Sequence, residues 1–376
     1  MHPLFSKEEG VRFSSIGKED AQVKRVAIGD VVLESGECIR QVEVGYQAYG
    51  TYDREANNAV LVCHALTGDV YVAGDEQRAG WWEGLIGPGM PIDTNKYYVI
   101  CSNVLGGCYG TTGPASLCPG DGKPYGSRFP FITIRDMVRV QRRLLEVLGV
   151  DQLYAIIGGS VGGMQVYEWM TEYPEMMQLA LPIATCSRFS AIAIAYNDVA
   201  RQAIQSDPEW QGGDYYPGAG PRRGLSVARM IGMITYRTAE LFEERFGRSL
   251  QAPNDSDPSQ TMFQIESYLR YQGEKLVDRF DANSYLTLLK AMDTHDIGVN
   301  RGGIEQALSR VQAKVVSIAI DSDLLYPDSH QREMAELMRR LGKDVDFYIM
   351  ESKYGHDGFL VEFQKMGRII KPYFDR

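Results

Sequence analysis

Apolar and polar residues alternate along the first fifty positions of the chain. In two runs, Val31–Leu33 and Val42–Tyr46, every second side chain is apolar, and Ser35-Gly36 between them has the composition of a turn. A period of two is typical of strands that have one face in the core and one in water. The beginning of the chain is therefore predicted to form antiparallel strands.

From residue 58 onward the pattern changes to continuous apolar runs, which are typical of parallel strands covered on both faces. These runs are Ala59–Cys63, Tyr97–Cys101, Leu153–Ile157, Leu179–Leu181, Val315–Ile320 and Val345–Met350. A helix is predicted before the third run, because Ile134, Val138 and Leu145 recur at helical spacing. Thr133 is its expected N-cap, with Asp136 three residues later.

The strand pattern is missing between residues 187 and 300. This segment has helical patterns, such as Leu225–Phe246, and a stretch rich in proline, glycine and aspartate at Asp207–Pro221. An α/β sheet that is interrupted once by a helical insertion accounts for this order. The predicted division is a core domain of residues 1–186 and 301–376, with a helical lid domain of residues 187–300 inserted in it.

Charge and composition exclude several classes of function. The 376 residues include 49 acidic and 39 basic side chains, a net charge of −10, and the basic residues form no cluster suited to nucleic acid. No apolar run reaches 18 residues, and Lys7, Glu8 and Glu9 stand where a signal peptide is apolar. The six cysteines contain no CxxC pair and there are only five histidines, so neither a metal site nor a disulfide framework is expected. We expect a soluble, cytoplasmic protein that binds neither membranes nor nucleic acid.

The candidate nucleophile is Ser160. It lies in Gly158-Gly159-Ser160-Val161-Gly162, a G-x-S-x-G motif directly after a buried strand and directly before a helical run. At such a strained turn, glycines allow close packing and the helix N-terminus favours negative charge. The alternative interpretation is a glycine-rich turn with an incidental serine. The motifs G-x-G-x-x-G and G-x-x-x-x-G-K-[ST] are both absent, which disfavours dinucleotide and nucleotide binding.

A serine nucleophile needs a base and an acid. Where the serine lies on a turn between a strand and a helix, as here, the acid follows it along the chain and the histidine follows the acid. Of the histidines after Ser160, His295 falls in the helical insertion and His330 opens a helix where a surface position is expected. His356 lies in a loop after the last strand, at the sheet edge where ligands bind, and is the candidate base. The acid is Asp321 or Asp323, both of which follow the preceding strand; spacing does not choose between them.

An oxyanion hole needs two backbone N–H groups. One is expected from Val161, the residue after the nucleophile, and the other from the loop after an early strand, where His64-Ala65-Leu66-Thr67-Gly68 lies. We interpret His64 as a partly buried, hydrogen-bonded histidine at the end of that strand, not as a catalytic base.

Eight motifs occur in one order along the chain and together resemble one family. They are His64–Asp69, Asn103–Cys108, Gly110–Pro114, Gly158–Gln165, Tyr268–Gly273, Phe280–Tyr285, Asp321–Pro327 and Gly355–Asp357. The chain resembles the homoserine O-acetyltransferases, which are acyltransferases of methionine biosynthesis with the α/β-hydrolase fold. The likeness runs from about Tyr46 to the C-terminus.

The resemblance implies an α/β-hydrolase fold, with a mostly parallel central sheet and a helical lid insertion. It implies that Ser160 is acylated, with Asp323 as the acid and His356 as the base of a triad. The N–H groups of Leu66 and Val161 would then form the oxyanion hole. Acetyl-CoA is the expected co-substrate, no cofactor is bound permanently, and a homodimer formed through the helical insertion is expected from the resemblance alone.

The resemblance also implies that Arg229, Tyr236 and Asp357 hold the amino-acid substrate. Arg229 and Tyr236 are seven residues apart, about two helical turns, so both project from one stripe of a helix. A guanidinium suits bidentate binding of an α-carboxylate, and a carboxylate suits an α-ammonium group.

The expected reaction is a two-step transfer of an acetyl group from acetyl-CoA through acyl-Ser160 to the γ-hydroxyl of L-homoserine. Three alternatives remain open at this point. Succinyl-CoA could be the donor or serine the acceptor, since either change can depend on a few pocket residues. An esterase would use the same triad with water. A binding module without activity would not need an intact triad.

Overall fold

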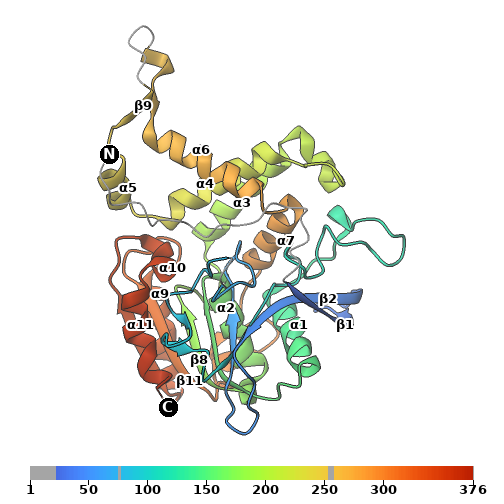
Figure 1. The fold of residues 1–376 in the computed structure, drawn as a ribbon, viewed down its shortest axis with the longest axis vertical. Coiled ribbons are helices and arrows are strands. Elements are labelled where there is room, and N and C mark those ends of the chain that lie inside the picture. Colours follow the sequence, from blue (N-terminus) through green and yellow to red (C-terminus); the bar gives the residue numbers. More distant parts are fainter. Residues whose placement is uncertain (1–22, 75–77, 253–257, 376) are drawn as a thin grey trace.

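A computed structural model describes residues 23–74, 78–252 and 258–375 (Figure 1). Its main element is one sheet of eight strands in the order β1-β2-β6-β3-β7-β8-β11-β12. The strands are β1 (Lys24–Val32), β2 (Cys38–Tyr49), β3 (Ala59–Cys63), β6 (Tyr98–Ser102), β7 (Leu153–Gly159), β8 (Met177–Ile183), β11 (Lys314–Ile320) and β12 (Val345–Met350). β4 (Ile86–Gly87) and β5 (Ile92–Asp93) form a separate parallel pair.

The predicted strand directions are confirmed. β1 pairs antiparallel with β2, and β2 pairs antiparallel with β6, while every later pair of neighbours in the sheet is parallel. Consequently the carboxyl ends of β3, β7, β11 and β12 meet at one edge of the sheet. The segments that follow these strands contain all three candidate triad residues and the candidate oxyanion loop.

Helices cover both faces of the sheet because side chains in the central strands alternate between two apolar clusters. Leu61 and Ile156 pack with one cluster, and Val62 and Ile157 pack with the other. The first cluster is closed by α1 (Ile134–Val147), α2 (Val161–Glu172), α8 (Ile304–Leu308) and α9 (Asp328–Arg340). The second is closed by α10 (Gly358–Val361), α11 (Phe363–Ile370) and the segment around β4 and β5.

The predicted start of α1 is confirmed. The Thr133 side chain accepts a hydrogen bond from the N–H of Asp136, and the Asp136 carboxylate accepts one from the N–H of Thr133. This reciprocal capping box satisfies two N–H groups that a helix leaves without intrahelical partners.

Between β8 and β11 the chain forms a helical layer that lies over one end of the sheet in Figure 1. Its helices are α3 (Ala191–Gln205), α4 (Arg222–Tyr236), α5 (Ala239–Arg245), α6 (Gln264–Val277) and α7 (Ala282–Asp293). The two stems of this segment pair with each other: the N–H of Phe189 donates to the carbonyl of His295, and the N–H of Ile297 to the carbonyl of Ser187. The chain therefore leaves and re-enters the sheet body at one place, which supports the division at residues 187 and 300. That division into two domains stays a prediction.

The structure adds two details within this segment that the sequence patterns did not give. The run Leu225–Phe246 is split into α4 and α5, since Thr238 caps α5 by accepting a hydrogen bond from the N–H of Leu241. The segment also contains two short antiparallel strands, β9 (Leu250–Ala252) and β10 (Met262–Phe263), which are too short for a pattern of alternation to reveal.

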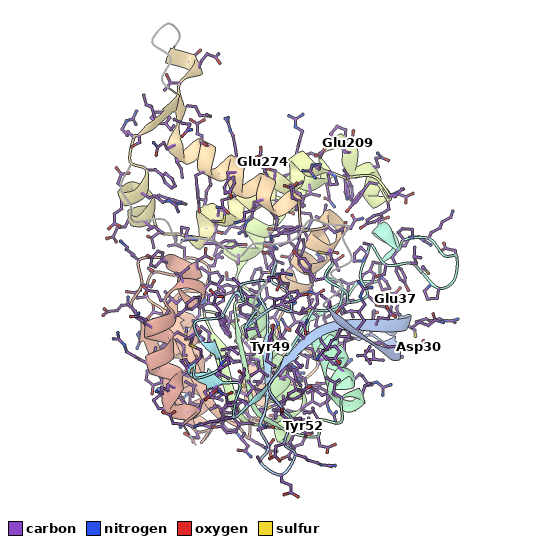
Figure 2. The ribbon with its side chains drawn as sticks, viewed as in Figure 1. Asp30, Glu37, Tyr49, Tyr52, Glu209 and Glu274 are labelled. Atoms are coloured by element: carbon purple, nitrogen blue, oxygen red, sulfur yellow. The ribbon has the colours of Figure 1, made fainter. Side chains whose placement is uncertain are left out.

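Acidic side chains are exposed on the surface of the molecule. Figure 2 shows Glu209 and Glu274 on the side of the helical layer that faces away from the sheet, and Asp30 and Glu37 on the hairpin of β1 and β2; all four are exposed. No helix among the described residues is long and apolar enough to cross a membrane.

Candidate active site

Ser160 occupies the strained turn that its motif predicts. It lies between β7 and α2 with φ 59° and ψ −125°, a left-handed conformation that costs free energy in a residue with a side chain. Its N–H donates to the carbonyl of Ile183 at 2.9 Å, and its carbonyl accepts from the Thr185 hydroxyl at 2.7 Å. These bonds to the neighbouring strand and the loop after it hold the turn in place, with Ser160 only 7% exposed.

The motif glycines are required by the approach of α2 to β3. A Cβ atom on Gly162 would lie 2.0 Å from the carbonyl oxygen of Cys63, and one on Gly158 would lie 2.6 Å from the backbone of Gly162. Both neighbours are backbone atoms that cannot rotate away. Gly158 and Gly162 are therefore structural conditions for the turn on which Ser160 lies.

The imidazole of His356 is paired with Asp323. Nδ1 of His356 lies 2.7 Å from Oδ2 of Asp323, and both side chains are buried. The second oxygen of Asp323 accepts hydrogen bonds from the N–H groups of Leu325 and Tyr326 at 2.8 and 3.0 Å, which fixes the carboxylate. Burial by itself lowers the pKa of His356, but the charge and hydrogen bond of Asp323 outweigh it, so this pKa is raised above its ordinary value.

The two aspartates that spacing left open have different surroundings. Asp321 is exposed and accepts a hydrogen bond from the N–H of Ser352 at 2.9 Å, so its carboxylate ties two loops together. Asp323, not Asp321, faces the imidazole. This is the arrangement that the resemblance implied.

His330 and His295 lie where the sequence placed them, whereas His64 is buried more deeply than expected. His330 is exposed on α9, and His295 is buried with Nε2 3.1 Å from the carbonyl of Cys186. His64 directly follows β3 and is almost completely buried, with Nδ1 2.7 Å from the carbonyl of Ala65. Burial lowers the pKa of His64 to about 4, so its ring is neutral near pH 7.

A cavity of about 660 Å³ opens between the end of the sheet and the helical insertion. This volume is within the range of small-molecule sites. The side chains of six predicted site residues line it, namely Leu66, Ser160, Arg229, Tyr236, His356 and Asp357. Val161 and Asp323 are not part of the lining: Asp323 lies behind the imidazole, and Val161 begins α2, so its N–H has no acceptor within the helix.

Arg229 and Tyr236 share one stripe of α4, as their spacing predicts. The guanidinium carbon of Arg229 lies 5.6 Å from the centre of the Tyr236 ring, and that ring lies 5.8 Å from the imidazole of His356. The helix therefore brings a cation and a phenol from the insertion to the base. Asp357 differs from expectation in one respect, because its carboxylate is already ion-paired with Arg237 at 2.9 Å.

Sequence reasoning gave no role to three residues of the cavity wall that contact predicted site residues or their loops. Arg237 follows α4 and pairs with Asp357; Tyr326 packs with its ring 5.0 Å from that of His356; Arg279, after α6, contacts the loop that contains Leu66. Tyr326 belongs to the motif Asp321–Pro327, but nothing in the pattern gave it a role. Arg237 and Arg279 contact residues more than a hundred positions away, and periodicity carries no signal for such contacts.

The arrangement of possible metal ligands does not suggest a metal centre. No group of three or more His, Cys, Asp or Glu side chains within the described residues is arranged to hold a metal ion. The six cysteines are free thiols, and burial raises the pKa of Cys63, Cys101 and Cys186 well above the ordinary value, which keeps these three protonated.

Comparison with known proteins gives consistent results over most of the chain. The sequence profile of the alpha/beta hydrolase fold matches residues 58–363. A curated relative, the homoserine O-acetyltransferase of Carboxydothermus hydrogenoformans, is 48% identical over 360 residues, which cover 94% of this chain and 95% of the relative.

Two solved structures are similar over nearly their full length. The homoserine O-acetyltransferase of Bacillus anthracis matches with a TM-score of 0.88 and 31% identity, covering 94% of this chain and 98% of that one. Esterase E22 matches with a TM-score of 0.86 and 29% identity, covering 94% and 100%. Similarity of fold alone therefore does not separate transfer to an acceptor from hydrolysis.

Proposed function

Since the chain belongs to the homoserine O-acetyltransferases of the α/β-hydrolase fold, we propose that it transfers the acetyl group of acetyl-CoA to the γ-hydroxyl of L-homoserine, a step of methionine biosynthesis. The observation that supports this most directly is the shared cavity. The cavity brings together a nucleophile and a base from the sheet body, a cation from the insertion, and a carboxylate beside the base.

The first half-reaction acylates Ser160. His356 accepts the proton of the Ser160 hydroxyl as its oxygen attacks the thioester carbonyl, and Asp323 stabilises the imidazolium that forms. The negative charge on the carbonyl oxygen is stabilised by the N–H groups of Leu66 and Val161. When the tetrahedral intermediate collapses, the carbon–sulfur bond breaks, His356 returns the proton to the thiolate, and coenzyme A leaves acetyl-Ser160.

The second half-reaction reverses these roles with a new nucleophile. His356 takes the proton of the homoserine γ-hydroxyl, which attacks acetyl-Ser160, and collapse of the intermediate returns the proton to Ser160. In this proposal Arg229 binds the α-carboxylate, Asp357 binds the α-ammonium group, and Tyr236 lies between Arg229 and the base. Holding the acceptor in this geometry raises its effective concentration against water.

Tyr326 fits this scheme as a buried wall of the site. Its pKa is raised well above the ordinary value, mainly by burial, against the effect of a hydrogen bond with Ser160. It is therefore a neutral phenol next to the nucleophile. Acetyl-CoA is a co-substrate in this proposal, and no permanently bound cofactor takes part.

Hydrolysis of esters is the second candidate, because esterase E22 has nearly the same fold. An esterase needs the triad and the oxyanion hole but has no use for an amino-acid site. The decisive experiment measures release of free coenzyme A from acetyl-CoA in the presence of homoserine, serine or water alone. Rapid release that depends on homoserine supports the transferase; equal release without an amino acid supports the esterase.

The same experiment addresses the alternatives of donor and acceptor. Succinyl-CoA in place of acetyl-CoA tests the donor, and serine tests whether the loss of one methylene is tolerated, a change worth about 1–3 kcal/mol in an apolar pocket. If neither thioester is cleaved with any acceptor while Ser160 reacts with no acylating reagent, a binding module without activity would replace the enzyme.

The helical insertion is also the proposed surface of a homodimer. Large apolar side chains are exposed on α3 and α4, namely Ile192, Val199, Val227 and Ile234. Such side chains are costly to leave in water when they are contiguous. Light scattering on the purified protein distinguishes a monomer from a dimer, and a location in the cytoplasm is part of the same proposal.

A further inference from the structure

The loop that contains Leu66 is fixed on its core side by His64. Nε2 of His64 accepts a hydrogen bond from the N–H of Val104 at 3.1 Å and lies 3.0 Å from the side-chain nitrogen of Asn103. The ring proton is therefore on Nδ1, which donates to the carbonyl of Ala65 at 2.7 Å. The N–H of Gly68 donates to the same carbonyl oxygen at 2.9 Å.

These bonds act on the N–H group of Leu66. The carbonyl of Ala65 and the N–H of Leu66 belong to one peptide unit, so two hydrogen bonds to the carbonyl hold that unit in orientation. They also polarise it, which makes the N–H a stronger donor.

Arg279 fixes the same loop from the opposite side. It follows α6 in the helical insertion and is 5% exposed. Its Nη1 donates to the carbonyl of Thr67 at 2.8 Å and to the hydroxyl of Tyr109 at 2.9 Å. The Tyr109 hydroxyl in turn donates to the main-chain carbonyl of Arg279 at 2.8 Å.

Asn103 joins the two sides into one network. Its side-chain oxygen accepts from the N–H of Tyr109 at 3.0 Å, and its nitrogen donates to His64. The hydrogen bonds thus run from His64 through Asn103 and Tyr109 to Arg279, and both ends of the network hold the loop on either side of Leu66.

The orientation of α6 explains how the helical insertion brings the Arg279 side chain to the loop that contains Leu66. Glu274 points away from the sheet into solvent (Figure 2), whereas Tyr271, Lys275 and Arg279, spaced by four residues, line the cavity. One face of α6 therefore forms a wall of the cavity, and Arg279, just beyond the end of α6, contacts the loop with Leu66.

We propose that Arg279 is a positioning residue that couples the docking of the helical insertion to the orientation of the Leu66 N–H group. The proposal rests on the function proposed above, since it takes this N–H as an oxyanion donor. A guanidinium is suited to the role because it donates to the Thr67 carbonyl and the Tyr109 hydroxyl at once, and a lysine cannot reproduce this planar geometry. Arg279 contributes by holding the donor in place and takes no proton.

The test compares Arg279→Met, Arg279→Lys and Tyr109→Phe with the wild type. Tyr109→Phe removes only a hydroxyl and keeps the ring packed on Phe280. The control is Arg222→Met, which removes a guanidinium from an exposed ion pair with Asp278 in the same insertion.

Two measurements need neither acetyl-CoA nor homoserine. The first is the rate of Ser160 acylation by 4-nitrophenyl acetate, followed as a burst of 4-nitrophenol. The second is the affinity for a boronic acid, in which the Ser160 oxygen adds to boron, the proton passes to His356, and a boronate oxygen takes the place of the oxyanion. The affinity for coenzyme A, which has no acyl carbonyl to become a tetrahedral oxyanion, is the reference for ground-state binding, and melting temperatures report on the fold.

For Arg279→Met we expect acylation and boronate affinity to fall about 10–100-fold, with coenzyme A affinity within about threefold of the wild type. Arg279→Lys restores part of the loss, Tyr109→Phe shows a smaller loss in the same direction, and Arg222→Met shows none. Unchanged boronate affinity in Arg279→Met, or an equal loss of coenzyme A affinity, overturns the proposal. If Arg279→Met does not fold, Tyr109→Phe decides, and wild-type boronate affinity in that variant overturns it. A wild type that acylates but ignores homoserine would contradict the transferase without affecting this result.

Discussion

Asp357 and Arg237 form an ion pair, 2.9 Å between Oδ2 and Nε, at the wall of the cavity. Their side chains are only 13% and 14% exposed, so the pair is shielded from water. We propose that the Asp357 carboxylate binds the ammonium group of the substrate. Its negative charge is therefore already balanced by Arg237 before any substrate binds. In the proposed complex, an incoming ammonium group shares the Asp357 carboxylate with Arg237.

This arrangement predicts different substrate preferences for two variants. Arg229→Met should raise the KM for homoserine about 10–100-fold, because one charge-assisted pair with the α-carboxylate is lost. Asp357→Asn should do the same through loss of the ammonium partner. Steady-state kinetics with analogues separate the two effects, since 3-aminopropanol lacks the carboxylate and 4-hydroxybutanoate lacks the amino group.

Arg229→Met should leave the weak use of 3-aminopropanol unchanged, and Asp357→Asn should leave that of 4-hydroxybutanoate unchanged. The reverse pattern would exchange the two assignments, and no change in either variant would remove both residues from the acceptor site. Asp328→Asn on α9 is the control for loss of a carboxylate away from the cavity.

The pH dependence of acylation should follow His356. The base must be neutral to accept the Ser160 proton, and its pKa is raised above the ordinary value of about 6.5. Acylation should therefore decline as the pH falls through a pKa above 6.5. In Asp323→Asn the effect of burial remains while the carboxylate charge is gone, so the decline should move to lower pH and the maximum rate should fall on the order of 10³–10⁴-fold. The burst rate measured across pH 5–9 tests both statements.

Gly162→Ala should prevent the turn at Ser160 from forming. The new Cβ would lie 2.0 Å from the carbonyl oxygen of Cys63, a main-chain atom at the end of β3. We expect a loss of about 3 kcal/mol or more in the free energy of unfolding, measured with urea, together with loss of acylation. Gly120→Ala is the matched control, since its nearest new contact is the Cys118 sulfur at 3.8 Å. Wild-type stability in Gly162→Ala would show that α2 can move away from β3.

Glu168→Gln should destabilise the protein. Oε2 of Glu168, on α2, accepts from Nε of Arg135 at 3.0 Å and from Nη1 of Arg301 at 2.7 Å, and all three side chains are buried. Removal of the negative charge leaves two buried guanidinium groups undercompensated, which costs about 3–5 kcal/mol in comparable cases. Thermal unfolding measures the effect, with Glu336→Gln, exposed on α9, as the control. The acylation rate of the folded fraction should stay within about threefold, because Glu168, Arg135 and Arg301 do not line the cavity; a large loss would contradict this view.

Structural features that depend on the local pattern of residues along the chain were predicted well. The capping box of Thr133 and Asp136 starts α1 through contacts three residues apart, and the strand runs are apolar because both faces of the sheet are covered. The break between α4 and α5 has a local cause, the Thr238 cap, and a distant one that periodicity along the chain does not reveal. There the Thr238 hydroxyl donates to the carbonyl of Lys353, and the backbone of Gly355 comes close to that of Tyr236, so the end of α4 is docked on the loop that carries His356.

The sequence by itself determined the order of strands and helices, the turn at Ser160 and the identity of the candidate nucleophile and base. These features depend on periodicity, glycine at one turn and the chain order of a triad. Only the tertiary structure brought Asp323 instead of Asp321 to His356, paired Asp357 with Arg237 and put Arg279 on the loop of Leu66. Each of those relationships depends on which side chain a folded loop directs at a distant partner. The pattern of residues along the chain does not contain that information.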